Sequence, residues 1–300
     1  MARTRDIVVG VIIGLGFLVG LAVMALMFIG MMSGGGDLGL TGLGGNVGIV
    51  EIFGVLDESS GRRAIEQIND WVDKGSIKAI VLHVVSPGGG VAISQEVHDA
   101  ILRAREHKPV VASMGAVAAS GGLYVAVASD RIVANPGTLT GSIGVIMQFY
   151  QADKLMEKVG LELETVKSGE FKDVGSLDRE MTEQEQLMLR SVVMDTYEQF
   201  VQAVAEGRSM DPDRVRELAD GAIFTGHQAL NYGLVDTLGG LHEAVQIAAA
   251  LAGLTGEPEL VRPYEPRKVT IFDLLGRVLS LDPRQAGGIL EGPRLMYLYQ

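Results

Sequence analysis

Apolar runs alternate with amphipathic segments along the chain from about residue 46 onward. Residues 47–53 and 77–85 are near-continuous runs of apolar, largely β-branched residues, a pattern typical of strands buried on both faces. Residues 60–74 and 91–107 instead carry apolar side chains at helical spacing. The same reading predicts strands at 109–114, 131–134 and 161–166, and helices at 123–128, 182–208, 211–219 and 240–252. This alternation predicts an α/β fold in which helices pack on a mostly parallel sheet.

The N-terminal part of the chain has a different pattern. Residues 7–32 contain no charged side chain and consist of Ile, Val, Leu, Gly, Ala, Phe and Met. At about 1.5 Å per residue, this run is long enough to cross a hydrocarbon core about 30 Å thick. A cleaved signal peptide has a shorter apolar stretch, about 7–15 residues, and an Ala-x-Ala-like site, which residues 31–34 do not offer. The pattern therefore predicts a transmembrane helix at residues 7–32.

The flanking charges predict how this helix is oriented. Arg3 and Arg5 precede the apolar run, whereas the first cation after it is Arg62. The positive-inside rule then places residues 1–6 in the cytoplasm and the rest of the chain on the outer side of the cell membrane. The glycine-rich residues 33–46 are expected to form a flexible linker. We expect a folded domain at residues 47–253 and a proline-interrupted extension at residues 254–300.

The composition of the chain argues against nucleic-acid binding and against metal or disulfide sites. The net charge of −12 argues against a nucleic-acid partner. The chain has no cysteine, which excludes disulfides and cysteine-ligated metals. Its five histidines are scattered and show no metal-binding spacing. We therefore expect neither a metal ion nor another cofactor.

Ser120 is the central candidate for chemistry. It is the only hydroxyl in the segment G-A-V-A-A-S-G-G at residues 115–122, between a predicted strand and a predicted helix. Free backbone N–H groups point outward at a helix N-terminus, a setting that suits a nucleophile whose product is an oxyanion. The alternative is a turn of small residues that serves only close packing.

A second glycine-rich segment, S-P-G-G-G at residues 86–90, follows the predicted strand at 77–85 and precedes a predicted helix. Its glycines let the backbone approach a ligand closely and present N–H groups to it. Sites in α/β sheets lie beyond the carboxyl ends of strands, where this loop falls. No phosphate-binding lysine motif follows it, and a plain tight turn is the other interpretation.

A nucleophilic serine needs a general base, and two kinds are possible. No histidine lies between Ser120 and Tyr150, and His83 falls within a predicted buried strand. Lysine is the other option, because burial can lower the pKa of its ammonium group from about 10.4 toward 7–8. Lys167 and Lys172 are the candidates, and physical reasoning alone does not choose between them.

Four ordered motifs carry a resemblance to a known family. They read S-P-G-G-G-V, K-P-V-V-A-S-M-G-A-V-A-A-S-G-G-L-Y, T-L-T-G-S-I-G-V-I and V-K-S-G-E-F-K-D. The set closely resembles the signal peptide peptidase A family, whose members are membrane-anchored Ser–Lys proteases related in fold to Clp protease and crotonases. The likeness covers roughly residues 48–253 and fits the short, single-domain form of the family.

The resemblance implies roles for individual residues. Ser120 would be the nucleophile, Lys172 its general base, and Ser142 a hydroxyl that orients the lysine. Gly88 and Gly89, together with the N–H of Gly121, would form the oxyanion hole.

It also implies an activity and an assembly. The expected enzyme is a serine endopeptidase that degrades cleaved signal peptides and other small extended hydrophobic peptides, and it forms a ring- or dome-shaped homo-oligomer. Three alternatives are a related membrane Ser–Lys protease that cuts stomatin-like proteins, a non-catalytic membrane scaffold, and an acyl-CoA enzyme of the crotonase type. The last lacks support, because an external domain would be separated from cytosolic CoA esters.

Overall fold

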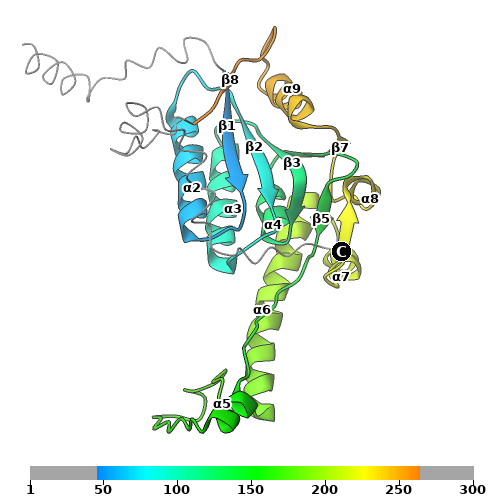
Figure 1. Ribbon diagram of the computed structural model, residues 1–300. Helices are drawn as coiled ribbons and strands as arrows, with labels where there is room; N and C mark the ends of the chain where they lie inside the picture. The colour runs from blue at the N-terminus through cyan, green and yellow to red at the C-terminus, as the bar shows by residue number, and fades with distance from the viewer. Residues whose placement is uncertain (1–45, 264–300) are drawn as a thin grey trace, which may run out of the picture. The chain divides into compact units, whose positions relative to one another are not determined.

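A mostly parallel β-sheet is the centre of the fold in the computed structural model, which describes residues 46–263 of the chain (Figure 1). The strand order is β6-β5-β3-β2-β1-β8, with β4 pairing with β3 and β7, and the β5–β6 pair is antiparallel. The strands are β1 (Val47–Phe53), β2 (Ala79–Ser86), β3 (Val110–Ala119), β4 (Arg131–Ala134), β5 (Leu139–Gly141), β6 (Ile223–Thr225), β7 (Thr237–Leu238) and β8 (Leu260–Val261). The predicted α/β class with a mostly parallel sheet is confirmed.

Four helices of the described chain begin after a residue whose side chain accepts one of their first backbone N–H groups. Asp57 caps α2 by accepting the N–H of Ser60 at 2.8 Å. Thr182 and Glu185 form the reciprocal capping box that the sequence T-E-Q-E predicts at the start of α6. The helices are α2 (Glu58–Asp73), α3 (Val91–Arg105), α4 (Gly121–Ala126), α5 (Asp153–Val159), α6 (Glu183–Arg208), α7 (Pro212–Leu218), α8 (Gly226–Asn231) and α9 (Leu241–Leu251).

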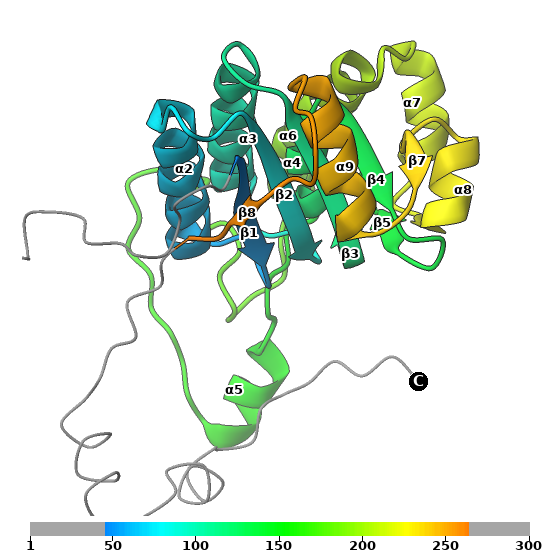
Figure 2. The same cartoon turned by 90° about the horizontal axis from the view of Figure 1, so that it is seen from above.

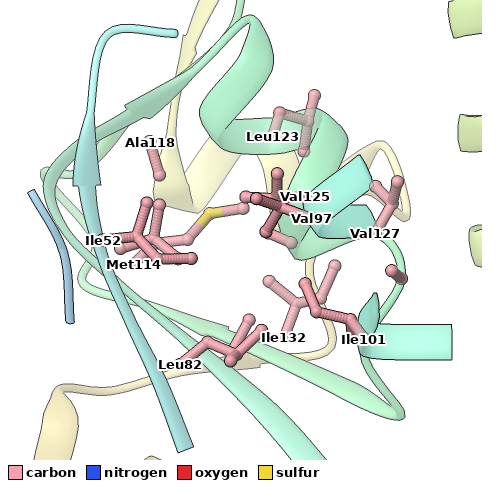
Figure 3. Close-up of a cluster of buried hydrophobic side chains, with 14 of the residues drawn as sticks. Ile52, Leu82, Val97, Ile101, Met114, Ala118, Leu123, Val125, Val127 and Ile132 are labelled. Atoms are coloured by element: carbon pink, nitrogen blue, oxygen red, sulfur yellow. The ribbon is translucent and has the colours of Figure 1, made fainter. Parts of the chain in front are cut away.

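Helices cover both faces of the sheet (Figure 2). On one face, α2, α3, α4 and the C-terminal end of α6 enclose the larger hydrophobic core, part of which Figure 3 shows around Leu82, Met114 and Ile132. On the other face, alanines of α9 pack against valines of the strands. Because the strands are buried on both faces, their sequences are apolar at nearly every position.

A long extension leaves this core, and we call residues 144–199 the arm. It consists of α5, the irregular segment around it and the N-terminal part of α6, and Figure 1 shows α5 at the end of α6 that is remote from the sheet. Before Phe200, only Glu185 is buried among the residues of α6. Large apolar side chains of the arm are exposed, among them Tyr150 at 93% and Val166 at 96%.

The prediction of a strand at residues 161–166 is wrong. The structure has no strand there, and every side chain in that stretch is exposed. A strand requires a neighbour for its backbone hydrogen bonds, and no strand of the sheet reaches this part of the arm.

The predicted transmembrane helix at residues 7–32 lies outside the described residues. Within residues 46–263, no helix combines the length and the apolar character that crossing a bilayer requires.

Candidate active site

Ser120 occupies a strained turn between β3 and α4. Strand β3 ends at Ala119, α4 begins at Gly121, and Ser120 between them has φ +52° and ψ −121°. Only two other non-glycine residues in the described chain, Ser142 and Ser209, have positive φ. Such angles cost free energy and persist where the surrounding structure imposes them, which is common at functional sites. The predicted strand–serine–helix arrangement is confirmed.

The glycine loop after β2 lies directly against Ser120. Leu56 holds it, because the Leu56 N–H donates to the Gly88 carbonyl at 2.9 Å and the Gly90 N–H donates to the Leu56 carbonyl at 2.8 Å. A Cβ atom on Gly88 would lie 2.8 Å from Ser120 Cβ and 3.1 Å from its Oγ, and the φ of Gly88 is +105°. Both the close approach and the backbone angle therefore require glycine at this position.

Two backbone N–H groups beside Ser120 have no acceptor among the described residues. The Gly88 N–H donates to Ser86 Oγ at 3.1 Å, whereas those of Gly89 and Gly121 make no such bond. The two lie close together, since a Cβ built on Gly121 would be 3.2 Å from the Gly89 nitrogen. Of the three predicted oxyanion-hole glycines, Gly89 and Gly121 thus offer available donors, and Gly88 supplies the space.

Strand pairing brings Ser142 beside Ser120. In the parallel pair β3–β5, Ala119 faces Gly141, and the Ser120 N–H donates to the Gly141 carbonyl at 2.9 Å. Ser120 and Ser142 are the next residues of these two neighbouring segments. Ser142 has φ +51°, and its N–H donates to the Ala222 carbonyl at 2.7 Å.

The structure does not join Lys172 to this pair of serines. Lys172 is exposed on the arm, and its ammonium group makes no hydrogen bond or ion pair with any described residue. Lys167, by contrast, binds the carboxylate of Asp173 at 2.7 Å and the carbonyl of Glu170 at 3.1 Å. Of the two candidate lysines, only Lys172 therefore has an unengaged amine within the described chain.

The two histidines His83 and His98 pack against aromatic rings. The ring of His83 packs edge-on against Phe53, with centroids 5.1 Å apart, and that of His98 packs on Tyr124 at 5.0 Å. Burial lowers the pKa of His98, partly offset by its contact with Asp99. Among the described residues, no cluster of three or more His, Asp or Glu side chains could hold a metal ion.

Sequence reasoning missed the residues that support the site. Leu56 fixes the glycine loop from a position that carries no motif, and Ser86 engages the Gly88 N–H. An ion-pair network also links Asp173, beside Lys172, to Glu185 through Arg179. The capping-box motif marks Glu185 as a helix-start residue, but nothing in that motif predicts its pairing with Arg179.

Comparisons match this chain to a peptidase family and to several proteases. The profile of peptidase family S49 matches residues 103–255. A putative protease of Synechocystis is 42% identical over 76% of this chain and 82% of its own length. A putative signal peptide peptidase SppA of Enterococcus faecium is 38% identical over 60% of this chain and 53% of its own. A chloroplastic serine protease SPPA of Arabidopsis thaliana is 35% identical over 85% of this chain and 40% of its own.

Proposed function

We propose a catalytic mechanism and a substrate class for this chain. The chain belongs to peptidase family S49, has relatives in the signal peptide peptidase A family, and is a serine peptidase. In our proposal, Ser120 is the nucleophile and Lys172 the general base, and the substrates are extended apolar peptides such as remnants of cleaved signal peptides. The observation that carries the proposal is the strained Ser120 turn, beside two unengaged backbone N–H groups.

The reaction follows from the groups at this turn. Neutral Lys172 Nζ takes the proton of Ser120 Oγ as the oxygen attacks the scissile carbonyl carbon. The N–H groups of Gly89 and Gly121 donate to the resulting oxyanion, and each such donor lowers the barrier by about 3–4 kcal/mol. The lysine ammonium then gives its proton to the leaving amine. Water attacks the acyl-enzyme by the same route and frees the serine.

The separation of the two reacting groups supports an assembly of identical copies. The core presents Ser120 without a base, whereas the arm presents Lys172 without a nucleophile. A lysine acts as a base near neutral pH only when its ammonium group is desolvated, which an exposed loop does not provide. In our proposal, the arm of one copy packs through its exposed apolar side chains on the next copy and places Lys172 beside Ser120 and Ser142. Ser142 then accepts a hydrogen bond from the lysine and orients it.

Membrane attachment and signal-peptide substrates complete the proposal. The uncharged run at residues 7–32 supports a membrane anchor with the catalytic domain outside the cytoplasm. The E. faecium relative is named a putative signal peptide peptidase, which supports substrates of that class. Apolar residues surround Ser120 in sequence and suit apolar peptides.

Three variants test the catalytic assignment in the full chain, extracted in detergent. We expect Ser120→Ala and Lys172→Ala each to lower the cleavage rate of an apolar reporter peptide by about 10³-fold or more, because each removes half of the reacting pair. Lys167→Ala, on the same loop, should retain far more activity than Lys172→Ala, because it leaves both reacting groups in place. If Lys167→Ala is inactive while Lys172→Ala is active, the base is assigned to the wrong lysine.

A further inference from the structure

A chain of ion pairs ties the Lys172 loop to the start of α6. Glu185 lies in the first turn of α6, and its side chain is only 2% exposed. Its Oε2 accepts the Thr182 N–H at 2.8 Å, which completes the helix cap. Arg179 donates to both oxygens of the same carboxylate, with 2.9 Å between Nη1 and Oε2. This two-pronged contact fixes the plane of the Arg179 guanidinium against a rigid helix end.

The other side of that guanidinium holds Asp173. Arg179 Nη2 lies 2.9 Å from Asp173 Oδ1, and Nε lies 3.2 Å from Oδ2. Lys167 Nζ approaches Oδ1 of the same carboxylate at 2.7 Å. Asp173 is therefore engaged by two cations at once, and both of its oxygens are occupied.

Asp173 is the direct sequence neighbour of Lys172, and this adjacency has a chemical consequence. A carboxylate within about 4–6 Å of a lysine ammonium group favours its protonated form, which cannot act as a base. Here Lys167 and Arg179 occupy that carboxylate, and the Lys172 ammonium has no partner among the described residues. The network thus holds the residue next to Lys172, and Asp173 makes its ion pairs with Lys167 and Arg179 instead of with Lys172.

We propose that Arg179 and Asp173 act as positioning residues for Lys172: the link Glu185–Arg179–Asp173 holds the lysine loop in place and prevents an Asp173–Lys172 ion pair. The proposal rests on the assignment of Lys172 as the base. It assigns Lys167 a role as well, as the second cation on Asp173, which accounts for two lysines on one loop.

The charges of this link balance. Two carboxylates, Asp173 and Glu185, face two cations, Lys167 and Arg179, so their formal sum is zero. The hydrogen bonds from Arg179 lower the pKa of both carboxyl groups to about 2, so both stay ionised at neutral pH. The other charged groups on this stretch, apart from Lys172 itself, are Glu170, Asp178, Glu180 and Glu183.

Two substitutions shift this balance in opposite directions. Arg179→Gln leaves Asp173 with one cation and free to pair with Lys172, so the acidic limb of kcat/KM against pH should move to higher pH. Asp173→Asn leaves two cations near Lys172 and no carboxylate between them, so the same limb should move to lower pH. Both variants should also lose about tenfold or more in kcat at the pH optimum, because the lysine is less well positioned.

A matched control exists on α7. Arg216 also bridges two carboxylates, binding Glu198 at 2.7 Å and Asp213 at 2.5 Å, and its hydrogen bonds and ion pairs do not involve the Lys172 loop. Arg216→Gln should leave both kcat and the pH profile unchanged. If Arg179→Gln disturbs the assembly, Arg179→Lys keeps the charge with fewer donors and should lower kcat without moving the limb.

The outcomes separate this proposal from the assignment of the base. If Lys172→Ala remains active, the assignment itself is wrong. If Lys172→Ala is inactive but Arg179→Gln and Asp173→Asn both keep the wild-type kcat and pH profile, the network is only structural and our inference is overturned. The inference is also overturned if the acidic limb of kcat/KM against pH moves in the same direction in both variants, because the charge balance requires opposite shifts.

Discussion

The core and the arm of this chain are built in opposite ways. In the core, large side chains such as Leu82 and Ile132 are completely buried, and packing holds Ser120 in a backbone conformation that it would not adopt alone. The arm leaves Tyr150 and Val166 almost fully exposed and fixes its loop with ion pairs instead. The core is thus complete within one chain, whereas the arm carries apolar surface that a second protein surface would bury.

Among changes that leave Ser120 and Lys172 in place, the largest effect should come from filling the space beside the proposed nucleophile. Gly88→Ala places a methyl group against Ser120 and forces a side chain into a φ of +105°. We expect kcat/KM to fall by about 10²-fold or more, because the loop that carries the proposed oxyanion donors would be displaced. Gly137→Ala is the control, because a Cβ there meets no atom within 4 Å. Equal activities of the two variants, measured on the reporter peptide, would show that the loop does not need to touch Ser120.

A pair of leucine substitutions contrasts the two regions directly. Leu123 on α4 is completely buried behind Ser120, whereas Leu187 on α6 is 67% exposed. Leu123→Ala should lower the free energy of unfolding by about 2–5 kcal/mol through a core cavity. Leu187→Ala should change it by only about 0.5 kcal/mol in the dissociated chain.

Measuring the assembly of the Leu187→Ala variant tests the role of the arm further. Light scattering across a dilution series should show that Leu187→Ala dissociates at higher protein concentration than the wild type, because in our proposal this side chain packs between copies. If Leu187→Ala assembles as the wild type does, this part of the arm does not lie in the interface.

The smallest effect should appear in acid. The pKa values of Asp173 and Glu185 are lowered to about 2 from ordinary values of 3.8 and 4.5, so their contribution to arm stability is present above about pH 4.5 and is lost as the pH falls toward 2. Hydrogen exchange should therefore show the first turn of α6 opening within this range. Trp71, the single tryptophan, lies in the core and reports its unfolding by fluorescence. If the first turn of α6 opens only at the pH at which Trp71 reports unfolding of the core, the ion pairs do not stabilise the arm independently of the core.

Sequence patterns predicted the core far better than the arm, for a physical reason. Strands β1 and β4 match their predicted bounds because buried strands are apolar throughout, and the T-E-Q-E motif placed the start of α6 through its hydrogen bonds. The short strands β5 to β8 have two or three residues each, too few to show any periodicity. The residues 161–166 contain several β-branched or apolar side chains but have no neighbouring strand, so local preference misled the prediction.

The sequence likewise predicted some features of the site and not others. The small residues around Ser120 predicted its turn, because only glycine tolerates such close approach. The proximity of Ser142 depends on the register between β3 and β5, which no local pattern contains. The link from Glu185 through Arg179 to Asp173 depends on how the loop folds back on α6, and spacing alone does not reveal it.

Complementation between two inactive variants tests most directly whether the core of one copy and the arm of another form one active site. Ser120→Ala supplies intact arms and Lys172→Ala supplies intact nucleophiles, so neither variant alone should cleave the reporter peptide. When the two full-length chains are co-expressed in equal amounts, we expect about a quarter of the wild-type activity, because random mixing pairs an intact serine with an intact lysine at about one site in four. An inactive mixture that assembles like the wild type would contradict the shared site and place both catalytic groups within a single chain.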